Sequence, residues 1–296
     1  MKKIAIIVIP ILFIFSLVFF INNDNENPDK QKNLPEPGNN QSQEEDEETK
    51  INTGLDDNQD KTSDQSDDRV TETDDINDEQ TEKEQTKYFI NKKYFVKPVN
   101  PEDENKVVLL TFDDAPQGNF TNEILDILDK YQAKAIFFIN GHYAVKHEEL
   151  VKEIYDRGHI IGNHTWWHED LRNLNLDKTI EEIIKLNDLV EEITGERPQF
   201  FRPPFGVMSD FARKVIEDEH MQSFNWSLGS LDWEYPKPEQ NEKVIAQVIN
   251  NLHNGANILM HDKEVTALAL EQILAELTEQ GYTFVLPTEI VIENNM

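Results

Sequence analysis

Short apolar runs alternate with amphipathic helical patterns over residues 88–296, and this alternation limits the possible folds more than any other feature of the chain. The runs are continuously apolar, which is typical of strands buried on both faces. We expect strands at 107–112, 135–139, 159–162, 200–202, 223–228, 258–260 and 283–286, and helices at 122–131, 148–157, 179–194, 209–217, 242–252 and 266–280. Repeated strand–helix units predict an α/β fold with a parallel sheet, either a small or incomplete (β/α) barrel or an open doubly wound sheet.

Residues 1–21 contain an uncharged apolar run, 4–21, that follows Lys2 and Lys3. As a helix this run would be about 27 Å long, close to the roughly 30 Å hydrocarbon core of a membrane. The apolar region of a signal peptide is usually shorter and ends in a small-residue cleavage site, which the sequence lacks at this point. We therefore expect an uncleaved signal anchor, with the two lysines in the cytoplasm and the rest of the chain outside. A cleaved signal, which would give a secreted protein, is the alternative.

Residues 22–87 carry half of the negative charge of the chain. They contain 22 Asp and Glu against 7 Lys and Arg, a net −15 of the formal −30. The segment has neither apolar periodicity nor aromatic residues, so it cannot bury enough surface to offset chain entropy, and we expect a disordered acidic linker. So acidic a chain is a poor candidate for nucleic-acid binding, because neutralising phosphates requires an excess of Lys and Arg.

Ionisable residues follow the ends of several predicted strands. They are Asp113 and Asp114, the histidines of segment 164–168, Arg202, Asp232 and His261. Because the carboxyl ends of parallel strands share one face of a barrel or sheet, and active sites lie there, we expect these side chains to meet.

His164 and His168 have a spacing that lets two imidazoles share one face of a helical turn. The spacing alone is a weak signal, because a packed or solvated pair of histidines shows it too. Asp114 adds a carboxylate from a neighbouring strand end, and two histidines with one carboxylate are typical of catalytic zinc. Asp113 cannot easily point the same way as Asp114 on extended backbone, so we expect it to serve as a base beside the metal. The chain has 0 Cys, which excludes thiolate ligands.

Five motifs, in order, resemble those of the polysaccharide deacetylases with a NodB-homology domain, also called carbohydrate esterase family 4. Residues 111–116 (TFDDAP) are similar to TFDDGP, 164–168 (HTWWH) to H-[ST]-x-x-H, 202–206 (RPPFG) to R-P-P-[YF]-G, 232–233 (DW) to the end of D-x-x-D-W, and 259–261 (LMH) to L-x-H. The resemblance implies a distorted (β/α) barrel of about seven strands. It also implies that residues 88–296 are a deacetylase domain that removes acetyl groups from N-acetylated sugars with the help of a metal ion.

The resemblance further implies roles for individual residues. Asp114, His164 and His168 would hold one divalent metal ion, with zinc as the first choice and cobalt or nickel as alternatives. Asp113 would be the general base and His261 the general acid. The supporting residues would be Arg202 beside Asp113, Asp232 beside His261, the backbone N–H of Phe205 at the oxyanion, and Trp233 and Leu259 around the acetyl group.

Two positions depart from the family pattern. Ala115 stands where TFDDGP has glycine, which matters only if that backbone needs a positive φ. Gly229 stands where D-x-x-D-W has its first Asp, which puts the fine tuning or substrate preference of the site in doubt. We also expect Trp166 and Trp167 to pack in the protein rather than face a sugar, and Asp262 to cap a helix N-terminus.

The sequence therefore predicts a metal-dependent N-deacetylase of a cell-surface glycan, bound to the membrane through residues 1–21 with its catalytic domain facing the cell wall. This location makes the N-acetyl sugars of peptidoglycan the first candidate substrate, and chitin-like N-acetylglucosamine polymers stay open. An esterase that removes O-acetyl groups from polysaccharide is the alternative enzyme. The alternative that is not an enzyme is a catalytically silent glycan-binding module on a wall tether. The sequence indicates no protein partner.

Overall fold

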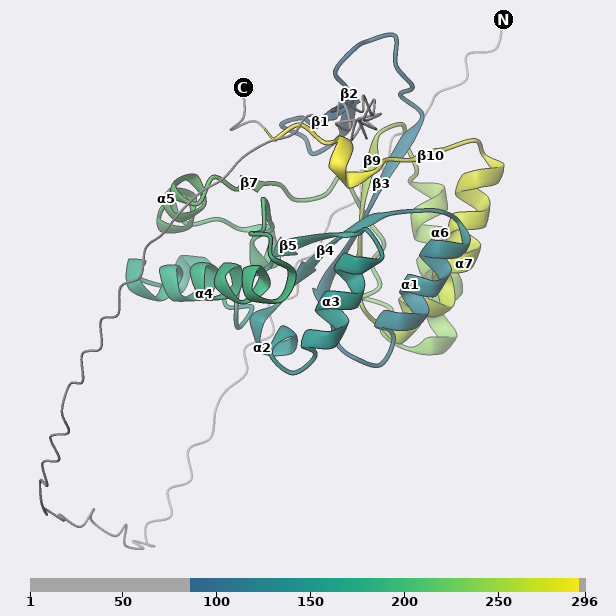
Figure 1. The fold of residues 1–296 in the computed structure, drawn as a ribbon. Helices are drawn as coiled ribbons and strands as arrows, with labels where there is room; N and C mark the ends of the chain where they lie inside the picture. Colours follow the sequence, from purple (N-terminus) through teal and green to yellow (C-terminus); the bar gives the residue numbers. More distant parts are fainter. Residues whose placement is uncertain (1–85, 293–296) are drawn as a thin grey trace, which may run out of the picture. The chain divides into compact units, whose positions relative to one another are not determined.

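Figure 1 shows a computed structural model of the chain, in which residues 86–292 are described. The expected signal anchor (1–21) and almost all of the expected linker (22–87) lie outside these residues. Between residues 86 and 292, no helix combines the length and the apolar character needed to cross a membrane. At the last residue of the expected linker, the backbone N–H of Lys87 donates to the carbonyl of Glu289 at 2.8 Å.

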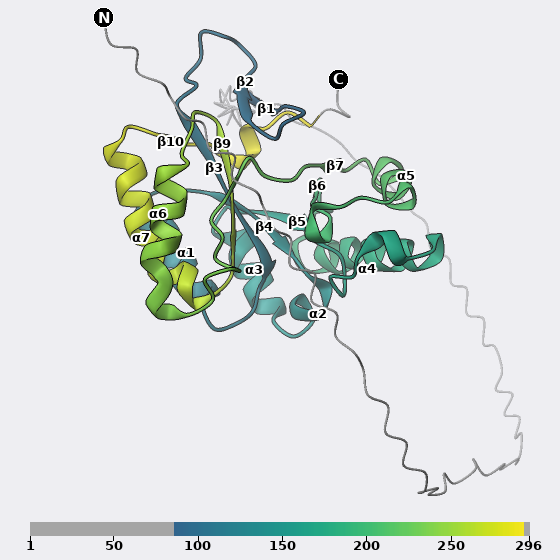
Figure 2. The same ribbon diagram turned by 180° about the vertical axis from the view of Figure 1, so that it is seen from behind.

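A parallel sheet forms the centre of the fold, in the order β7-β6-β5-β4-β3-β9-β8, with β10 paired to β3 (Figures 1 and 2). Its strands are β3 (Val107–Ala115), β4 (Ala135–Ile139), β5 (Ile160–Asn163), β6 (Phe200–Phe201), β7 (Gln222–Ser223), β8 (Leu228–Gly229), β9 (Ala256–His261) and β10 (Thr283–Phe284). Within the described part of the chain β7 and β8 do not pair with each other, so the sheet curls without closing. The predicted α/β fold is confirmed as this half-closed barrel.

Helices cover the outer face of the sheet. They are α1 (Thr121–Lys130), α2 (Gly141–Ala144), α3 (Glu148–Asp156), α4 (Leu176–Thr194), α5 (Asp210–Asp218), α6 (Asn241–Asn250) and α7 (Glu264–Glu279). In both ribbon views α1, α6 and α7 lie together at one end of the sheet, and α4 and α5 lie together at the other. All except the short α2 match helices expected from the amphipathic pattern.

Strand β3 shows why the predicted strands read as continuous apolar runs. Val108, Leu110 and Phe112 pack into the core under the helices, whereas Val107 and Leu109 pack into a second core inside the curled sheet. A hairpin of β1 (Tyr88–Ile90) and β2 (Val96–Pro98), which we did not expect, contributes to this second core. Inward positions alternate along a strand, so Thr111 and Asp113 continue the inner row into the site described below.

One predicted strand is wrong: the run 223–228 forms two separate strands of two residues each, β7 and β8. The segment between them leaves the sheet because its backbone bonds to other elements. The carbonyl of Asn225 accepts hydrogen bonds from Arg202 Nη2 at 3.1 Å and from Asn257 Nδ2 at 2.9 Å. This interruption opens the barrel and lets Trp226 enter the wall of the site.

Candidate active site

The carboxyl ends of the strands meet at a cavity of about 440 Å³. It is lined by Asp113, Asp114, His164, His168, Pro203, Phe205, Gly206, Trp226, Trp233, Leu259, His261 and Lys263. The structure thus brings together the residues predicted as base, acid, metal ligands and acetyl-pocket wall. The two predicted supporting residues, Arg202 and Asp232, are fully buried behind the cavity wall. A larger cavity of about 920 Å³ lies beside Arg197 and Glu219 and contains none of the predicted site residues.

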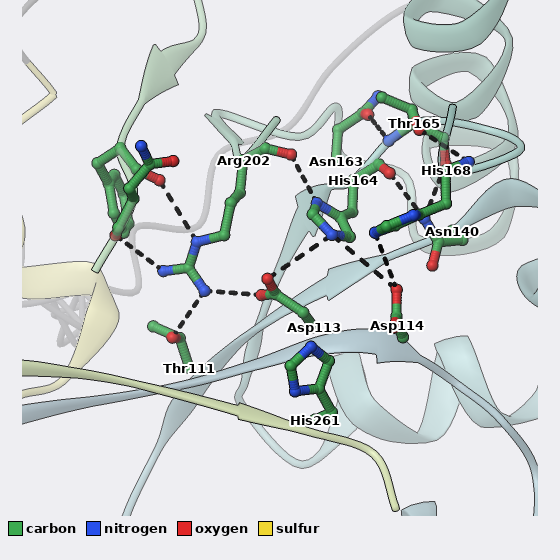
Figure 3. A network of polar contacts seen from close by, with 12 residues as sticks. Thr111, Asp113, Asp114, Asn140, Asn163, His164, Thr165, His168, Arg202 and His261 are labelled. Carbon is green, nitrogen blue, oxygen red and sulfur yellow. Dashed lines mark hydrogen bonds and ion pairs between the residues drawn. The ribbon is translucent and has the colours of Figure 1, made fainter. Parts of the chain in front are cut away.

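Three possible metal ligands converge in this cavity. One ligand atom from each of Asp114, His164 and His168 lies within 4.8 Å of the others. Nε2 of His168 is 3.6 Å and Nε2 of His164 is 4.0 Å from Oδ1 of Asp114 (Figure 3). These separations are too long for hydrogen bonds. They are close to the roughly 3.4 Å that separates two tetrahedral ligands each about 2.1 Å from one ion.

His164 is oriented by the backbone of a different strand end. Its Nδ1 lies 2.6 Å from the carbonyl of Arg202, so Nδ1 carries the proton and donates it to that oxygen. Burial lowers the pKa of His164 to about 3, so the ring stays neutral and Nε2 keeps its lone pair. A neutral imidazole fixed through its other nitrogen is typical of a metal ligand. The donor set therefore fits a divalent ion such as zinc.

The two histidines do not share a helical turn, contrary to the expectation from their spacing. Residues 164–168 form a loop after β5, in which Thr165 and His168 have left-handed φ values of +69° and +59°. The Thr165 Oγ1 accepts a hydrogen bond from the backbone N–H of His168 at 3.1 Å, and Asn163 Oδ1 accepts one from that of Thr165 at 2.8 Å. A looped backbone therefore brings the imidazoles together.

Asp113 and Asp114 both face the cavity, which extended backbone would not allow. The pairing of β3 with β4 shifts register between Asp113 and Ala115, and Asp114 adopts a φ of +61°. A bulge of this kind re-aims a side chain at the end of a strand. The expectation that the two carboxylates point apart is wrong for this reason. Asp113 does lie beside the three possible metal ligands, with its Oδ2 3.6 Å from Nε2 of His164.

The carboxylate of Asp113 forms a buried ion pair with Arg202. Nη1 of Arg202 donates to Oδ1 of Asp113 at 2.7 Å and to Oγ1 of Thr111 at 2.9 Å (Figure 3). Burial raises the pKa of Asp113, and the charges of Arg202 and His261 limit that rise. A raised pKa suits a general base, because proton transfer is most effective when the pKa of the base lies near the operating pH.

His261 is paired with Asp232 in the same way that Asp113 is paired with Arg202. Nδ1 of His261 lies 2.7 Å from Oδ1 of Asp232, whose Oδ2 accepts bonds from the His261 backbone N–H and the Thr266 hydroxyl, each at 2.7 Å. Burial alone would lower the pKa of His261, but the charge and hydrogen bond of Asp232 outweigh it, and the pKa is raised. His261 is thus favoured as a proton donor.

Aromatic rings form the outer wall of the cavity. The Trp233 ring lies 5.4 Å from that of His261 and 6.4 Å from that of Trp226. Phe205 is 63% exposed and its ring lies 4.8 Å from that of His168. Sequence reasoning missed Trp226, because no motif includes it and it lay inside a strand that the structure interrupts.

The two tryptophans between the ligands differ from each other. Trp166 is buried as expected, with the Lys185 ammonium 3.8 Å from its ring centre. Trp167 is 58% exposed and stacks on His142 with ring centres 5.5 Å apart. It does not pack as expected, and it does not line the cavity.

The departures from the family pattern have different structural consequences. Ala115 is buried without a positive φ, so alanine causes no backbone strain there. At Gly229, a Cβ atom would lie 2.9 Å from Cη2 of Trp233, so the indole ring occupies the space that a side chain would need. Asp262 does not cap α7, because Lys263 is the N-cap residue. Its buried Oδ2 instead accepts bonds from Thr121 Oγ1 at 2.6 Å and from the backbone N–H of Gln117 at 2.9 Å.

Sequence reasoning also missed buried polar residues behind the loop 164–168, the ligand loop, which carries two possible metal ligands. Nδ2 of Asn140 donates to the carbonyl of His164 at 2.7 Å, and Oε2 of Glu182 accepts from the backbone N–H of Trp167 at 2.8 Å. A signal for Glu182 exists in the sequence, since it lies on the same helical face as the apolar residues Ile183 and Leu186.

Comparisons with known proteins agree on one family. Residues 100–224 match the family described as polysaccharide deacetylase. Peptidoglycan-N-acetylmuramic acid deacetylase PdaA of Bacillus subtilis (strain 168) is 32% identical over 195 residues, which covers 65% of this chain and 74% of that protein. The structure of peptidoglycan deacetylase PdaC from Bacillus subtilis is similar with a TM-score of 0.58 at 33% identity, covering 67% of this chain and 92% of that one. A CE4 family pseudoenzyme from Bacillus anthracis, BA3943, is similar with a TM-score of 0.57 at 31% identity, covering 61% of this chain and 63% of that one.

Proposed function

The chain belongs to the polysaccharide deacetylase family, and on this premise we propose that it is a metal-dependent hydrolase that removes acetyl groups from the N-acetyl sugars of peptidoglycan. The observation that supports this proposal most directly is that a possible general base and a possible general acid, each hydrogen-bonded to a buried partner, lie beside three possible metal ligands. The hydrogen bond between Asp113 and Arg202 and the one between His261 and Asp232 are both 2.7 Å long. Asp113 and His261 both line the cavity that contains the three possible metal ligands.

In the proposed reaction, a divalent ion bound to Asp114, His164 and His168 would polarise the amide carbonyl and lower the pKa of a water molecule. Asp113 accepts the proton of the attacking water, and Arg202 keeps the carboxylate in place. His261 donates a proton to the nitrogen of the departing amine, which is a poor leaving group while unprotonated. The backbone N–H of Phe205 donates to the oxygen on which negative charge develops.

The acetyl group is proposed to lie against Trp233 and Leu259, which face the cavity beside His261. Zinc is the proposed ion because neutral imidazole and carboxylate ligands suit it. The same set of ligands also binds cobalt or nickel. The names of PdaA and PdaC are the support for a peptidoglycan substrate. A wall-facing location, with residues 1–21 as a membrane anchor, 22–87 as a linker and 88–296 as the catalytic domain, is proposed from the sequence alone.

Acetate release by the purified full-length protein tests the proposal. Metal-free protein is reconstituted with zinc or cobalt and incubated with peptidoglycan glycan strands, N-acetylglucosamine oligomers and an O-acetylated polysaccharide. We expect release from N-acetyl substrates that needs added metal and is lost in His164→Ala. Release from the O-acetylated polysaccharide alone would indicate the esterase instead.

A silent glycan-binding protein is the second candidate, and the similarity to a CE4 family pseudoenzyme supports testing it. The presence of a base, an acid and three possible ligands in one cavity argues for catalysis. Metal content separates the two: bound glycan with neither bound metal nor released acetate would support the silent module.

A further inference from the structure

We propose that Glu182 of α4 is a positioning residue, whose buried carboxylate holds the loop 164–168 in the conformation that directs His164 and His168 toward one metal ion. This inference deepens the metal-binding part of the proposed function and rests on it. It assigns a role to a residue that lies outside every motif used above.

The ligand loop needs external support because of its backbone conformation. Thr165 and His168 both adopt left-handed φ values, +69° and +59°. Residues with a Cβ atom disfavour this region, and such conformations persist only where the surrounding structure determines them. Some element outside the loop must therefore hold it.

Glu182 is the carboxylate that reaches the loop from α4, the helix behind it. It is 5% exposed, and Oε2 accepts the backbone N–H of Trp167 at 2.8 Å. Trp167 directly precedes the ligand His168, so this bond holds the loop beside that ligand. Within the loop, Thr165 Oγ1 accepts the backbone N–H of His168 at 3.1 Å.

Glu182 forms no ion pair within residues 86–292, where no Lys or Arg nitrogen lies within 4.0 Å of its carboxylate, although Lys178 is near enough to feel its charge. The nearby Lys185 ammonium lies over the Trp166 ring instead. A buried carboxylate is costly unless hydrogen-bond donors compensate it. The donor that compensates Glu182, the backbone N–H of Trp167, belongs to the loop 164–168, so the burial of this carboxylate and the loop conformation depend on each other.

Two neighbouring glutamates of α4 allow a matched test. Glu182→Ala removes the buried carboxylate, and Glu182→Gln keeps one oxygen that can accept the N–H of Trp167. Glu181→Ala makes the same change one position away, at an exposed residue that pairs with Lys178. Metal-free full-length proteins are titrated with zinc in competition with a chromophoric chelator, and with cobalt while its visible absorption is followed. Thermal unfolding in the presence of a chelator reports the stability of each metal-free fold.

We expect Glu182→Ala to weaken zinc affinity about 10- to 100-fold, as loss of a residue that orients metal ligands does. Glu182→Gln is expected to lie between it and the parent, and Glu181→Ala to match the parent. Parental zinc affinity and cobalt absorption in folded Glu182→Ala would overturn the proposal, because a merely structural role lowers stability alone. If Glu182→Ala does not fold, parental affinity in Glu182→Gln overturns it equally. A parent that binds zinc but releases no acetate refutes the proposed activity alone, whereas a parent that binds no zinc refutes both.

Discussion

Arg202 contacts both Asp113 and His164 in the candidate site, through two different groups. Its guanidinium donates to Oδ1 of Asp113 at 2.7 Å, and its backbone carbonyl accepts the Nδ1 proton of His164 at 2.6 Å. One residue directly after β6 therefore positions the proposed base and one proposed metal ligand. The side chains of Arg202 and Asp113 are both almost completely shielded from solvent, so neither charge can be satisfied by water if its partner is lost.

Arg202→Met is expected to destabilise the protein strongly. It leaves the buried Asp113 without its cation, and breaking a buried ion pair from one side costs about 3–5 kcal/mol in the free energy of unfolding. Urea denaturation of metal-free protein measures the change. Arg172→Met is the control, because Arg172 pairs with Asp170 at the surface and its loss should have little effect. Equal losses in the two variants would contradict the importance assigned to the buried pair.

Asp232→Asn is expected to move the alkaline limb of the pH profile of kcat/KM to lower pH. The acid His261 must be protonated, and its pKa is raised because the charge and hydrogen bond of Asp232 outweigh burial. Without that charge, burial lowers the pKa of His261, and activity is lost at lower pH. Acetate release measured across the neutral and alkaline range reports the limb. An unchanged limb would mean that His261 is not the group observed.

The pair of His261 and Asp232 also predicts how the free energy of unfolding changes with pH. Because the folded pKa of His261 lies above its ordinary value, the stability that its protonation contributes is complete below about pH 6.5, the pKa of an unperturbed histidine, while Asp232 stays ionised. It is lost as pH rises through the raised folded value. We expect Asp232→Asn to remove this alkaline decline in unfolding free energy, and urea denaturation at a series of pH values measures it.

Removal of one ligand is expected to abolish the stabilisation by metal. Zinc that binds only the folded state at a free concentration 100 times its Kd stabilises it by about 2.7 kcal/mol. His168→Asn should lose most of this gain in a thermal scan with and without zinc. His220→Asn is a matched control, since His220 also has a left-handed φ and lies outside the cavity. Asparagine tolerates that conformation. A full zinc response in His168→Asn would exclude it as a ligand.

Gly229→Ala is expected to lower the free energy of unfolding by about 1–3 kcal/mol, because the new Cβ overpacks the wall of the cavity. That atom would lie 2.9 Å from Cη2 of Trp233. Trp233→Phe removes the outer ring, so the double variant should recover part of the loss in a double-mutant cycle. Additive losses would show that Trp233 does not occupy the space beside Gly229.

The sequence was sufficient to predict most of the sheet strands, the longer helices and most of the ionisable residues that line the cavity. Apolar runs and amphipathic periods are properties of neighbouring residues, so β3, β4 and β9 and the long helices could be located from them. Because parallel strands end at a common edge, the polar residues that follow those runs could be expected to meet, and Asp114, His164 and His261 do line one cavity.

How those residues meet could be known only from the folded structure. The left-handed backbone at Asp114 and His168, the interruption that admits Trp226, and the support of the ligand loop by Glu182 arise from contacts between segments distant in sequence. Local propensity disfavours a left-handed aspartate or histidine, and it places Glu182 in an ordinary helix. Such conformations are stable because buried hydrogen bonds from other elements compensate their cost, and those bonds exist only once the chain has folded.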